Sequence, residues 1–351
     1  MQWITNTDTI IFAPQFNTKL DPNLLLNYKK IIFSDYELCD NLFDDYINNN
    51  FSKLDYNDSI FNRPVDNLPR TITHLTFGHC FDHQVNNLPK NLTHLTFGIQ
   101  FNKPVNNLPK NLTHLTLGRF FEHPLNNLPK NLTHLTISDE FNLPVDNLPS
   151  TLTHLTLGAC FNFPIDDLPP RLTHLVSGCR FNHPVKYLPK TITHLTFGDC
   201  FNHPVNWLPQ TITHLSFGCQ FNQSSDLPSS IKYLKLNSNN NYLINNLPNG
   251  IEELILGGYF NSELNNLPNG IKKIIFDSKR DYFELKYNYD KELNCLPNFL
   301  EYLKLPYKYN KKILNIPPKL KKILCSRDYK FVDDFTNTNI DIEFIDTEIE
   351  Y

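Results

Sequence analysis

A histidine recurs every 20 residues through the middle of the chain, each time preceded by threonine and followed by leucine. The eight copies are His74, His94, His114, His134, His154, His174, His194 and His214. Imidazole is a common transition-metal ligand, so neighbouring copies could share a Zn²⁺, Ni²⁺ or Cu²⁺ ion. Metal centres, however, combine ligands of mixed type in a closed geometry, and the next outward positions are mostly threonine. We therefore expect no metal and no cofactor, and interpret the histidines as polar residues of an exposed strand copied by duplication.

The cysteines are the other candidate metal ligands. Cys80, Cys160 and Cys200 share one repeat position, and Cys179 and Cys219 share the position before it. Two of them begin a Cys-x-x-His spacing, but no second Cys-x-x-Cys half stands nearby, so the zinc signal is weak. We expect these thiols to be small apolar side chains buried under a turn. Eight cysteines in 351 residues are too sparse for a disulfide scaffold, which favours a reducing intracellular compartment.

The sequence lacks the familiar catalytic motifs. It contains no Gly-rich phosphate loop, no Gly-x-Ser-x-Gly and no His-Glu-x-x-His, which mark nucleotide, hydrolase and zinc-protease sites. Catalysis needs one unique constellation of polar groups, whereas the polar residues here are spread evenly over eight copies. The sequence therefore predicts a binding protein with no catalytic residues rather than an enzyme.

The element that positions the histidines is a 20-residue repeat. Its clearest marker is a phenylalanine, found without a slip at Phe61, Phe81, Phe101, Phe121, Phe141, Phe161, Phe181, Phe201 and Phe221. A fixed period of roughly 20–50 residues is typical of a solenoid. One such unit is too small to bury its own apolar face, so neighbouring units must stack to make a continuous core.

Within one repeat, Leu112, Leu115 and Leu117 spell the Leu-x-x-Leu-x-Leu core of a leucine-rich repeat. Because side chains alternate faces along a strand, Leu115 and Leu117 are expected to point inward. His114 and Thr116 then point outward, and stacking in register places the histidines in one column. The second outward column contains Thr76, Thr96, Thr116, Thr136, Thr156 and Thr196.

The rest of each repeat returns the chain to the next strand. Gly118 permits a tight bend, and Phe121 is expected to enter the core. Pro124 and Pro129 fix φ and lack a donor, which argues against a helix on the return side. We therefore predict a right-handed, leucine-rich-repeat-like β-solenoid with a 20-residue period, a parallel sheet on its concave face and turn or 3₁₀ segments on its convex face.

The repeat pattern weakens toward both ends, as expected of terminal turns that cap an exposed core. We divide the chain into degenerate N-terminal repeats (1–59), the regular solenoid (60–276) and degenerate C-terminal repeats (277–351). Further strands are expected at 10–12, 31–33, 54–56, 234–236, 254–256, 274–276, 303–305, 323–325 and 342–344. The only helix expected spans 35–50, and the longest insertion spans 277–294.

The units FNKPVNNLP and FNHPVNWLP resemble the FNIP repeat. This leucine-rich-repeat-like family is common in social amoebae and in giant viruses that infect amoebae. The resemblance covers about residues 60–270 well and the flanks in degraded form. It implies that the repeats are interaction modules, which in this family are sometimes joined to an F-box that would recruit a ubiquitin ligase. Residues 1–50 contain no clear F-box, because its opening Leu-Pro and apolar periodicity are missing.

These features predict a non-catalytic protein–protein interaction scaffold that uses its concave columns. The contact surface is expected to consist chiefly of His114, His134, His154, Thr116, Thr136 and Thr156. Two alternatives stay open: a substrate-recognition adaptor for ubiquitination, by family analogy, and a structural component that stacks end to end. Toward the C-terminus the outward face becomes a mildly basic strip that consists of Lys232, Tyr233, Lys235, Glu252, Glu253, Lys272, Lys273, Tyr302, Lys304, Lys321 and Lys322. This strip either meets an acidic partner or is a solvated face.

Composition limits the remaining classes of partner. A formal net charge of −4 gives no global drive toward nucleic acid or acidic membranes. No stretch approaches the ~18 apolar residues of a membrane helix, and residues 1–14 do not resemble a signal peptide. We expect an intracellular, cytoplasmic monomer (in the host cytoplasm if the protein is viral) with a protein partner and without nucleic-acid or membrane partners.

The histidine column also predicts a pH dependence. Charging neighbouring imidazoles in a ladder is mutually unfavourable, so the histidines should titrate as a coupled group, some with pKa values below the free value. The stability of the native state should then fall as the pH drops through ~6, because the unfolded chain binds more protons.

Overall fold

The computed structural model describes residues 3–36, 57–277, 289–336 and 338–345. These residues form a parallel-strand β-solenoid of about 15 turns with little helix, which confirms the predicted fold class. The chain divides into two compact units, Met1–Gly178 and Cys179–Tyr351, and each is described by itself. The division into 1–59, 60–276 and 277–351 expected from the regularity of the repeats remains a prediction.

The first unit is a ladder of short strands, one for each described turn from β2 onward, preceded by β1. They are β1 (Trp3–Thr5), β2 (Thr9–Phe12), β3 (Lys30–Phe33), β4 (His74–Thr76), β5 (His94–Thr96), β6 (His114–Thr116), β7 (His134–Thr136), β8 (His154–Thr156) and β9 (His174–Val176). From β2 onward the neighbours pair in parallel, with histidine opposite histidine from β4 to β9. β1 pairs antiparallel with β2, an arrangement that the repeat pattern does not predict.

The second unit repeats the architecture with longer strands. Its elements are β10 (His194–Thr196), β11 (His214–Phe217), β12 (Tyr233–Leu236), α2 (Asn241–Asn245), β13 (Glu253–Leu256), β14 (Lys273–Phe276), β15 (Tyr302–Lys304), β16 (Lys322–Ser326), α3 (Asp333–Thr336) and β17 (Asp341–Ile345). Neighbouring strands from β10 to β17 pair in parallel. β17 confirms the last strand expected at 342–344.

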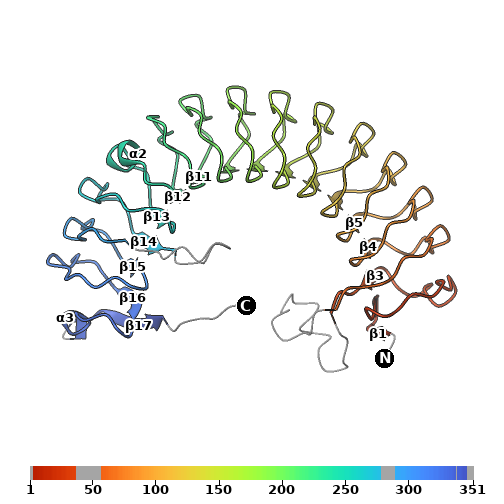
Figure 1. Ribbon diagram of the computed structural model, residues 1–351, viewed down its shortest axis with the longest axis horizontal. Coiled ribbons are helices and arrows are strands. Elements are labelled where there is room, and N and C mark those ends of the chain that lie inside the picture. Colours follow the sequence, from red (N-terminus) through yellow and green to blue (C-terminus); the bar gives the residue numbers. More distant parts are fainter. Residues whose placement is uncertain (1–2, 37–56, 278–288, 337, 346–351) are drawn as a thin grey trace. The chain divides into compact units, whose positions relative to one another are not determined.

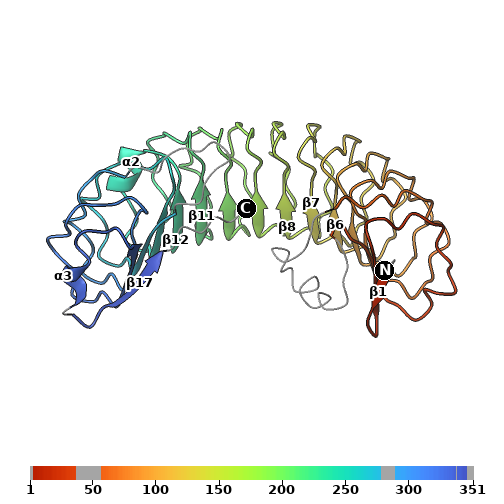
Figure 2. The same cartoon turned by 60° about the horizontal axis from the view of Figure 1, so that its bottom comes forward.

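Within each unit the strands line the inner side and the turns form the outer side (Figure 1). Figure 2 shows β6, β7 and β8 as neighbouring arrows in one unit, and β11 beside β12 in the other. The returning segments are closed by hydrogen bonds between residues three apart, the spacing of a 3₁₀ turn. Leu92 N–H donates to the Pro89 carbonyl (3.0 Å), and Phe101 N–H donates to the Gly98 carbonyl (3.3 Å). The sheet and the turns therefore occupy the faces that the sequence predicts.

The core consists of stacked apolar columns. Leu115 is 1% exposed and Phe101 is 0% exposed, as the alternation of the repeat predicts. The rings of Phe81 and Phe101 lie 6.1 Å apart and nearly parallel, at 8°. The Phe77 ring, which follows strand β4, stacks on Phe81 at 3.6 Å. Each turn therefore covers the aromatic ring of the turn before it, and the repeat gains its core only by stacking.

The expectation of a single helix was wrong, because α2 and α3 are short helices within the described residues. Leu243 of α2 stands at the repeat position that Pro104 occupies in a regular turn. Unlike proline, Leu243 has an N–H group, and it donates this to the side-chain oxygen of Asn240 (3.0 Å), which caps the helix. The strand expected at 54–56, most of the helix expected at 35–50, and residues 278–288 of the insertion lie outside the described residues.

Candidate binding surface

The inner face of the first unit carries the outward columns that the sequence predicts. In β4 to β8 the central leucine is buried and the flanking histidine and threonine are half-buried at the surface. In β9 the second outward position is Val176, which is 38% exposed. The structure thus places His74 to His174 in one column of the first unit, with Thr76 to Thr156 beside it. In the second unit, His194 and His214 lie opposite each other in the same manner.

The imidazole rings stack face to face along this column. The ring centroids of His94 and His114 lie 4.1 Å apart with 12° between the planes, and those of His134 and His154 lie 4.0 Å apart at 12°. The same spacing joins the column from His74 to His174. In the second unit, His194 and His214 stack at 4.0 Å and 14°. We call these stacked residues the histidine ladder.

A threonine that sequence reasoning overlooked fixes the orientation of each ring. The hydroxyl of Thr113 lies 3.1 Å from the Thr93 carbonyl, to which it donates, and 2.9 Å from Nδ1 of His114. A hydroxyl has a single hydrogen, so it must accept its second bond from a protonated Nδ1. The hydrogen-bond network therefore assigns the Nδ1–H tautomer and leaves Nε2 unprotonated as an acceptor.

The same pair of contacts recurs from turn to turn. It is present at Thr93, Thr133, Thr153, Thr173 and Thr213. The unbroken Thr-His dipeptide was the signal that could have identified this second role for threonine. Each ring is held by a hydrogen bond and by its stacked neighbours before any partner binds.

The surroundings favour the uncharged form of four ladder histidines, His74, His94, His114 and His134. Desolvation, and then repulsion from neighbouring histidines, lowers the pKa of His94 and His114 below the ordinary value. The same causes lower the pKa of His134 to about 4. At His74 desolvation is again the main cause, followed by the positive charge of Lys30. In this state the inner face presents a row of hydrogen-bond acceptors.

The stacking geometry is unsuited to metal binding. Parallel rings direct their Nε2 lone pairs side by side, so that adjacent imidazoles do not converge on a common ion, and Nδ1 is already engaged by threonine. Among the described residues, no group of three or more histidines, cysteines, aspartates or glutamates could hold an ion. This geometry leaves Nε2 of each ring as a hydrogen-bond acceptor on the inner face.

The expectation that the repeat cysteines are buried was wrong. Cys80, Cys160, Cys200 and Cys219 are half-buried, and Cys179 is exposed. Their backbone bonds the turns together, as when Cys200 N–H donates to the Cys179 carbonyl (2.9 Å), which leaves the side chains at the outer surface. Partial desolvation and the nearby Asp199 raise the pKa of the Cys219 thiol to about 11, so this thiol is protonated at neutral pH.

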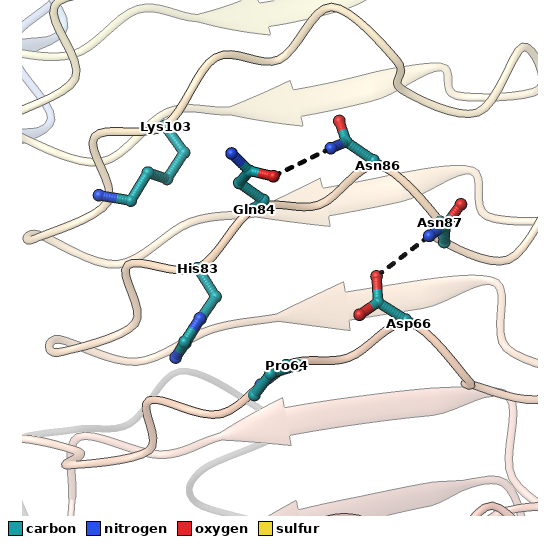
Figure 3. A pocket seen from close by; sticks show the side chains of 7 residues that line it. All are labelled: Pro64, Asp66, His83, Gln84, Asn86, Asn87 and Lys103. Atoms are coloured by element: carbon teal, nitrogen blue, oxygen red, sulfur yellow. Dashed lines mark hydrogen bonds between the residues drawn. The ribbon is translucent and has the colours of Figure 1, made fainter.

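A polar depression of about 400 Å³ lies on the outer turns of the first unit (Figure 3). It is lined by Pro64, Asp66, His83, Gln84, Asn86, Asn87 and Lys103. Asn87 donates to Asp66 (3.3 Å) and Asn86 donates to Gln84 (3.2 Å). The Lys103 ammonium pairs with a neighbouring carboxylate at 2.6 Å. The polar groups of Asn86, Asn87 and Lys103 are thus bonded to neighbouring side chains. The depression therefore gives no support for a catalytic site.

In the outward face of the second unit, lysines of the expected strip pair with glutamates. Lys232 and Lys272 both pair with Glu252, at 3.3 and 2.7 Å. Lys321 pairs with Glu301 at 2.7 Å. Lysine and glutamate therefore alternate from turn to turn and neutralise each other within the sheet. This arrangement favours the solvated-face interpretation of the strip over a binding site for an acidic partner.

The comparisons with known proteins agree with this architecture. The sequence model of a family described as FNIP Repeat matches at residues 56–98, 84–120, 121–160, 161–200, 181–220, 201–239 and 239–279. A search of the curated proteins found no match.

In the described residues, no helix combines the length and the apolar character needed to cross a membrane.

Among solved structures, the chain is similar to CroV588, a giant-virus protein described as a novel circular LRR protein. The TM-score is 0.76 at 30% identity, over 98% of this chain and 54% of that chain. The chain therefore spans about half the length of this relative. YopM from Yersinia enterocolitica is matched at 18% identity and a TM-score of 0.44, over 89% of this chain and 67% of that chain.

Proposed function

The chain belongs to the FNIP-repeat family, and on that premise we propose that it is a non-catalytic scaffold that binds a protein through the inner face of its strands. The observation that carries this proposal is the histidine ladder of the first unit. Six consecutive turns present the same imidazole edge in the same orientation. Identical groups repeated along a sheet suit an extended partner that makes a weak contact at each turn.

The orientation of the rings favours binding because little freedom remains to be lost. Ordering a flexible side chain at an interface costs about 0.5–1.5 kcal/mol, whereas each ladder imidazole is already fixed by a threonine and by its neighbours. We propose that the central contacts are the ladder residues His114, His134 and His154 with the adjacent Thr116, Thr136 and Thr156. The partner would donate hydrogen bonds to Nε2 of each imidazole.

The same features support the remaining parts of the proposal. A row of identical imidazoles offers no unique acid, base or nucleophile, and we propose that the scaffold has no catalytic residues. The acceptor character of the inner face is the opposite of what a phosphate backbone requires, so nucleic acid is not the proposed partner of this face. Because eight cysteines in 351 residues are sparse for a disulfide scaffold, we further propose a cytoplasmic compartment, and we propose that the protein acts there as a monomer.

The test is an affinity capture from a eukaryotic, ideally amoebal, lysate followed by mass spectrometry. The variant His114→Glu, His134→Glu, His154→Glu removes the Nε2 acceptors of three ladder imidazoles and puts three carboxylates in their place. The matched control is His83→Glu, His123→Glu, His203→Glu. These outer histidines bond through Nε2 to backbone carbonyls at 3.1, 3.2 and 3.0 Å. Circular dichroism of both variants would verify that the solenoid is folded.

We expect a partner that the native chain and the control capture and that the ladder variant loses by at least tenfold. Equal capture by all three proteins would contradict the proposal and move the contact to the outer turns. The identity of the partner then separates the alternatives. A ligase subunit would favour the ubiquitination adaptor that rests on family analogy, and capture of the chain itself would favour end-to-end assembly.

A further inference from the structure

A second row of side chains runs along the first unit outside the histidine ladder. Arg70, Lys90, Lys110 and Lys130 occupy one repeat position, in the turn that precedes strands β4 to β7, and all four are exposed. Asn111 donates to the Lys90 carbonyl (3.0 Å), and Asn131 donates to the Lys110 carbonyl (3.0 Å). Successive turns are thus bonded together at this row, and the four cations follow one another at intervals of one turn. We call them the cation row.

The cation row is unpaired within the described part of its unit. The ion pairs there join other residues, such as Lys103 with Asp82 and Arg119 with Glu140. The residues four positions before the three lysines are the neutral Asn86, Asn106 and Asn126, and the following residues are Asn91, Asn111 and Asn131. The three lysines therefore follow neutral amides and form no ion pair within the described residues, whereas Arg70 follows Asp66, whose carboxylate accepts from Asn87 (3.3 Å).

The second unit shows how the same fold balances a charged column. There Glu252 lies between Lys232 and Lys272, and Glu301 pairs with Lys321, so opposite charges alternate along the stack. Like charges on directly neighbouring strands are unfavourable, and opposite charges are favourable. The cation row of the first unit lacks such interleaved acids, and an anionic partner would supply the missing charges.

We propose that the cation row binds an extended acidic polypeptide segment that runs along the first unit from turn to turn. Parallel strands repeat at ~4.8 Å, whereas side chains on one face of an extended peptide repeat at ~6.6 Å. The flexible four-carbon stem of lysine lets the ammonium group shift along the row to match the spacing of the peptide. The ammonium group can also donate to carboxylates from several directions. Single-stranded nucleic acid is disfavoured because its binding sites combine cations with aromatic stacking platforms, and the residues that flank this row in the sequence are prolines, asparagines and one threonine.

This inference goes beyond the scaffold proposal, because the cation row and the histidine ladder are different residues and can be tested separately. The probe is a fluorescein-labelled peptide of about twelve glutamates, titrated with the full chain and followed by fluorescence anisotropy. The variant is Lys90→Glu, Lys110→Glu, Lys130→Glu. The control with the same change in net charge is Lys308→Glu, Lys319→Glu, Lys330→Glu, at exposed lysines of the second unit.

We expect saturable binding by the native chain, a Kd at least tenfold weaker in the row variant, and a change of less than twofold in the control. A milder variant, Lys90→Gln, Lys110→Gln, Lys130→Gln, should also bind at least threefold more weakly, which covers the case in which the glutamates prevent folding. The ladder variant His114→Asn, His134→Asn, His154→Asn should bind the peptide as the native chain does.

Three results would overturn the inference. The first is no saturable binding of the glutamate peptide at low salt, and the second is an equal loss in the row variant and its charge-matched control. The third is tighter binding of a single-stranded oligothymidine of the same length than of the peptide, which would identify the row as a nucleic-acid site. If the variant Lys90→Glu, Lys110→Glu, Lys130→Glu loses peptide binding but still captures the partner of the histidine ladder, the scaffold proposal stands and the cation row is a separate site.

Discussion

The threonine that precedes each ladder histidine decides what the residue offers to a partner. An imidazole on an exposed strand can exist in two neutral tautomers, and which nitrogen carries the proton is set by the bond that the other one makes. In each of these turns the threonine hydroxyl gives its hydrogen to the backbone of the previous turn and accepts Nδ1–H of the histidine. The result is a uniform row of Nε2 acceptors rather than a mixture of donors and acceptors.

The lowered pKa values of the ladder predict a loss of stability in acid. The pKa of His134 is lowered from 6.5 to about 4 in the folded protein, so between these values the unfolded chain binds more protons than the native one. The contribution of His134 to stability is therefore fully present above pH 6.5 and is lost as the pH drops toward 4. Urea unfolding at pH 7.5, 6, 5 and 4.5 should show a falling midpoint. A midpoint that stays constant from pH 7.5 to 5 would contradict this.

The appropriate comparison is the variant His114→Asn, His134→Asn, His154→Asn. Asparagine is polar and does not titrate, so the variant should lose less stability between pH 7.5 and 5 than the native chain does. Its midpoint at pH 7.5 should be lower, because the stacked rings and their threonine bonds are gone. An equal pH dependence in both proteins would assign the effect to carboxylates elsewhere.

At the residue scale the sequence predicts faces well and atomic partners poorly. Alternation along a strand was enough to place His114 outward and Leu115 inward. It could not show that the Thr113 hydroxyl bridges two turns, because that bond depends on the offset between neighbouring strands. It also gave the wrong burial for Cys160 and Cys200, since a period of 20 says nothing about how deeply a turn residue lies.

At the element scale, the glycines after the strands set how closely the turns approach. A Cβ atom built on Gly118 would overlap the carbonyl oxygen of Gly98 in the previous turn, and one on Gly98 would overlap that of Gly78. These are contacts with backbone, which cannot swing aside as a flexible side chain can. The column of glycines therefore allows the turns to stack directly behind each strand, and Ser138 is the one residue with a Cβ between Gly78 and Gly178 in this column.

Replacing one of these glycines should separate the turns on either side of it. Gly118→Ala is expected to lower the free energy of unfolding by about 1–3 kcal/mol, the usual cost of overpacking, measured by urea denaturation. Gly270→Ala is the control, because the nearest atom to its Cβ, the Asn249 carbonyl oxygen, is 3.1 Å away. Equal stability of the two variants would show that the turns move apart at little cost.

The elements themselves were predictable wherever the repeat is regular. The period placed β4 to β11 without error, because stacked turns must keep the same residue in the same place. It missed β1, which pairs antiparallel and so belongs to no repeat. It also missed α2, although the replacement of the repeat proline by Leu243 freed a backbone N–H for the Asn240 cap. Positions at which the sequence departs from the repeat therefore indicate where the local structure departs from a regular turn.

At the scale of the whole molecule, stability should behave as a sum over turns. In a solenoid each turn contacts only its neighbours, and the turns of the first unit are joined by the same register and the same aromatic column throughout. The sequence is uniform across this region, so it identifies the stacking unit. It does not reveal that the compact units divide at Gly178 and Cys179, because nothing in the repeat changes there.

Removing one complete turn should therefore leave the solenoid folded. Deletion of 101–120 joins Gln100 to Phe121, so that Phe121 takes the place of Phe101 and His134 stacks on His94. Urea unfolding of this variant should remain cooperative, with a smaller m-value because less surface becomes exposed. Deletion of only 101–110 is the control. It brings Asn111 to the position of Phe101, so polar residues enter the aromatic column and the strand register is lost. A cooperative transition in the half-turn deletion, or its loss in the full-turn deletion, would show that the turns are not interchangeable stacking units.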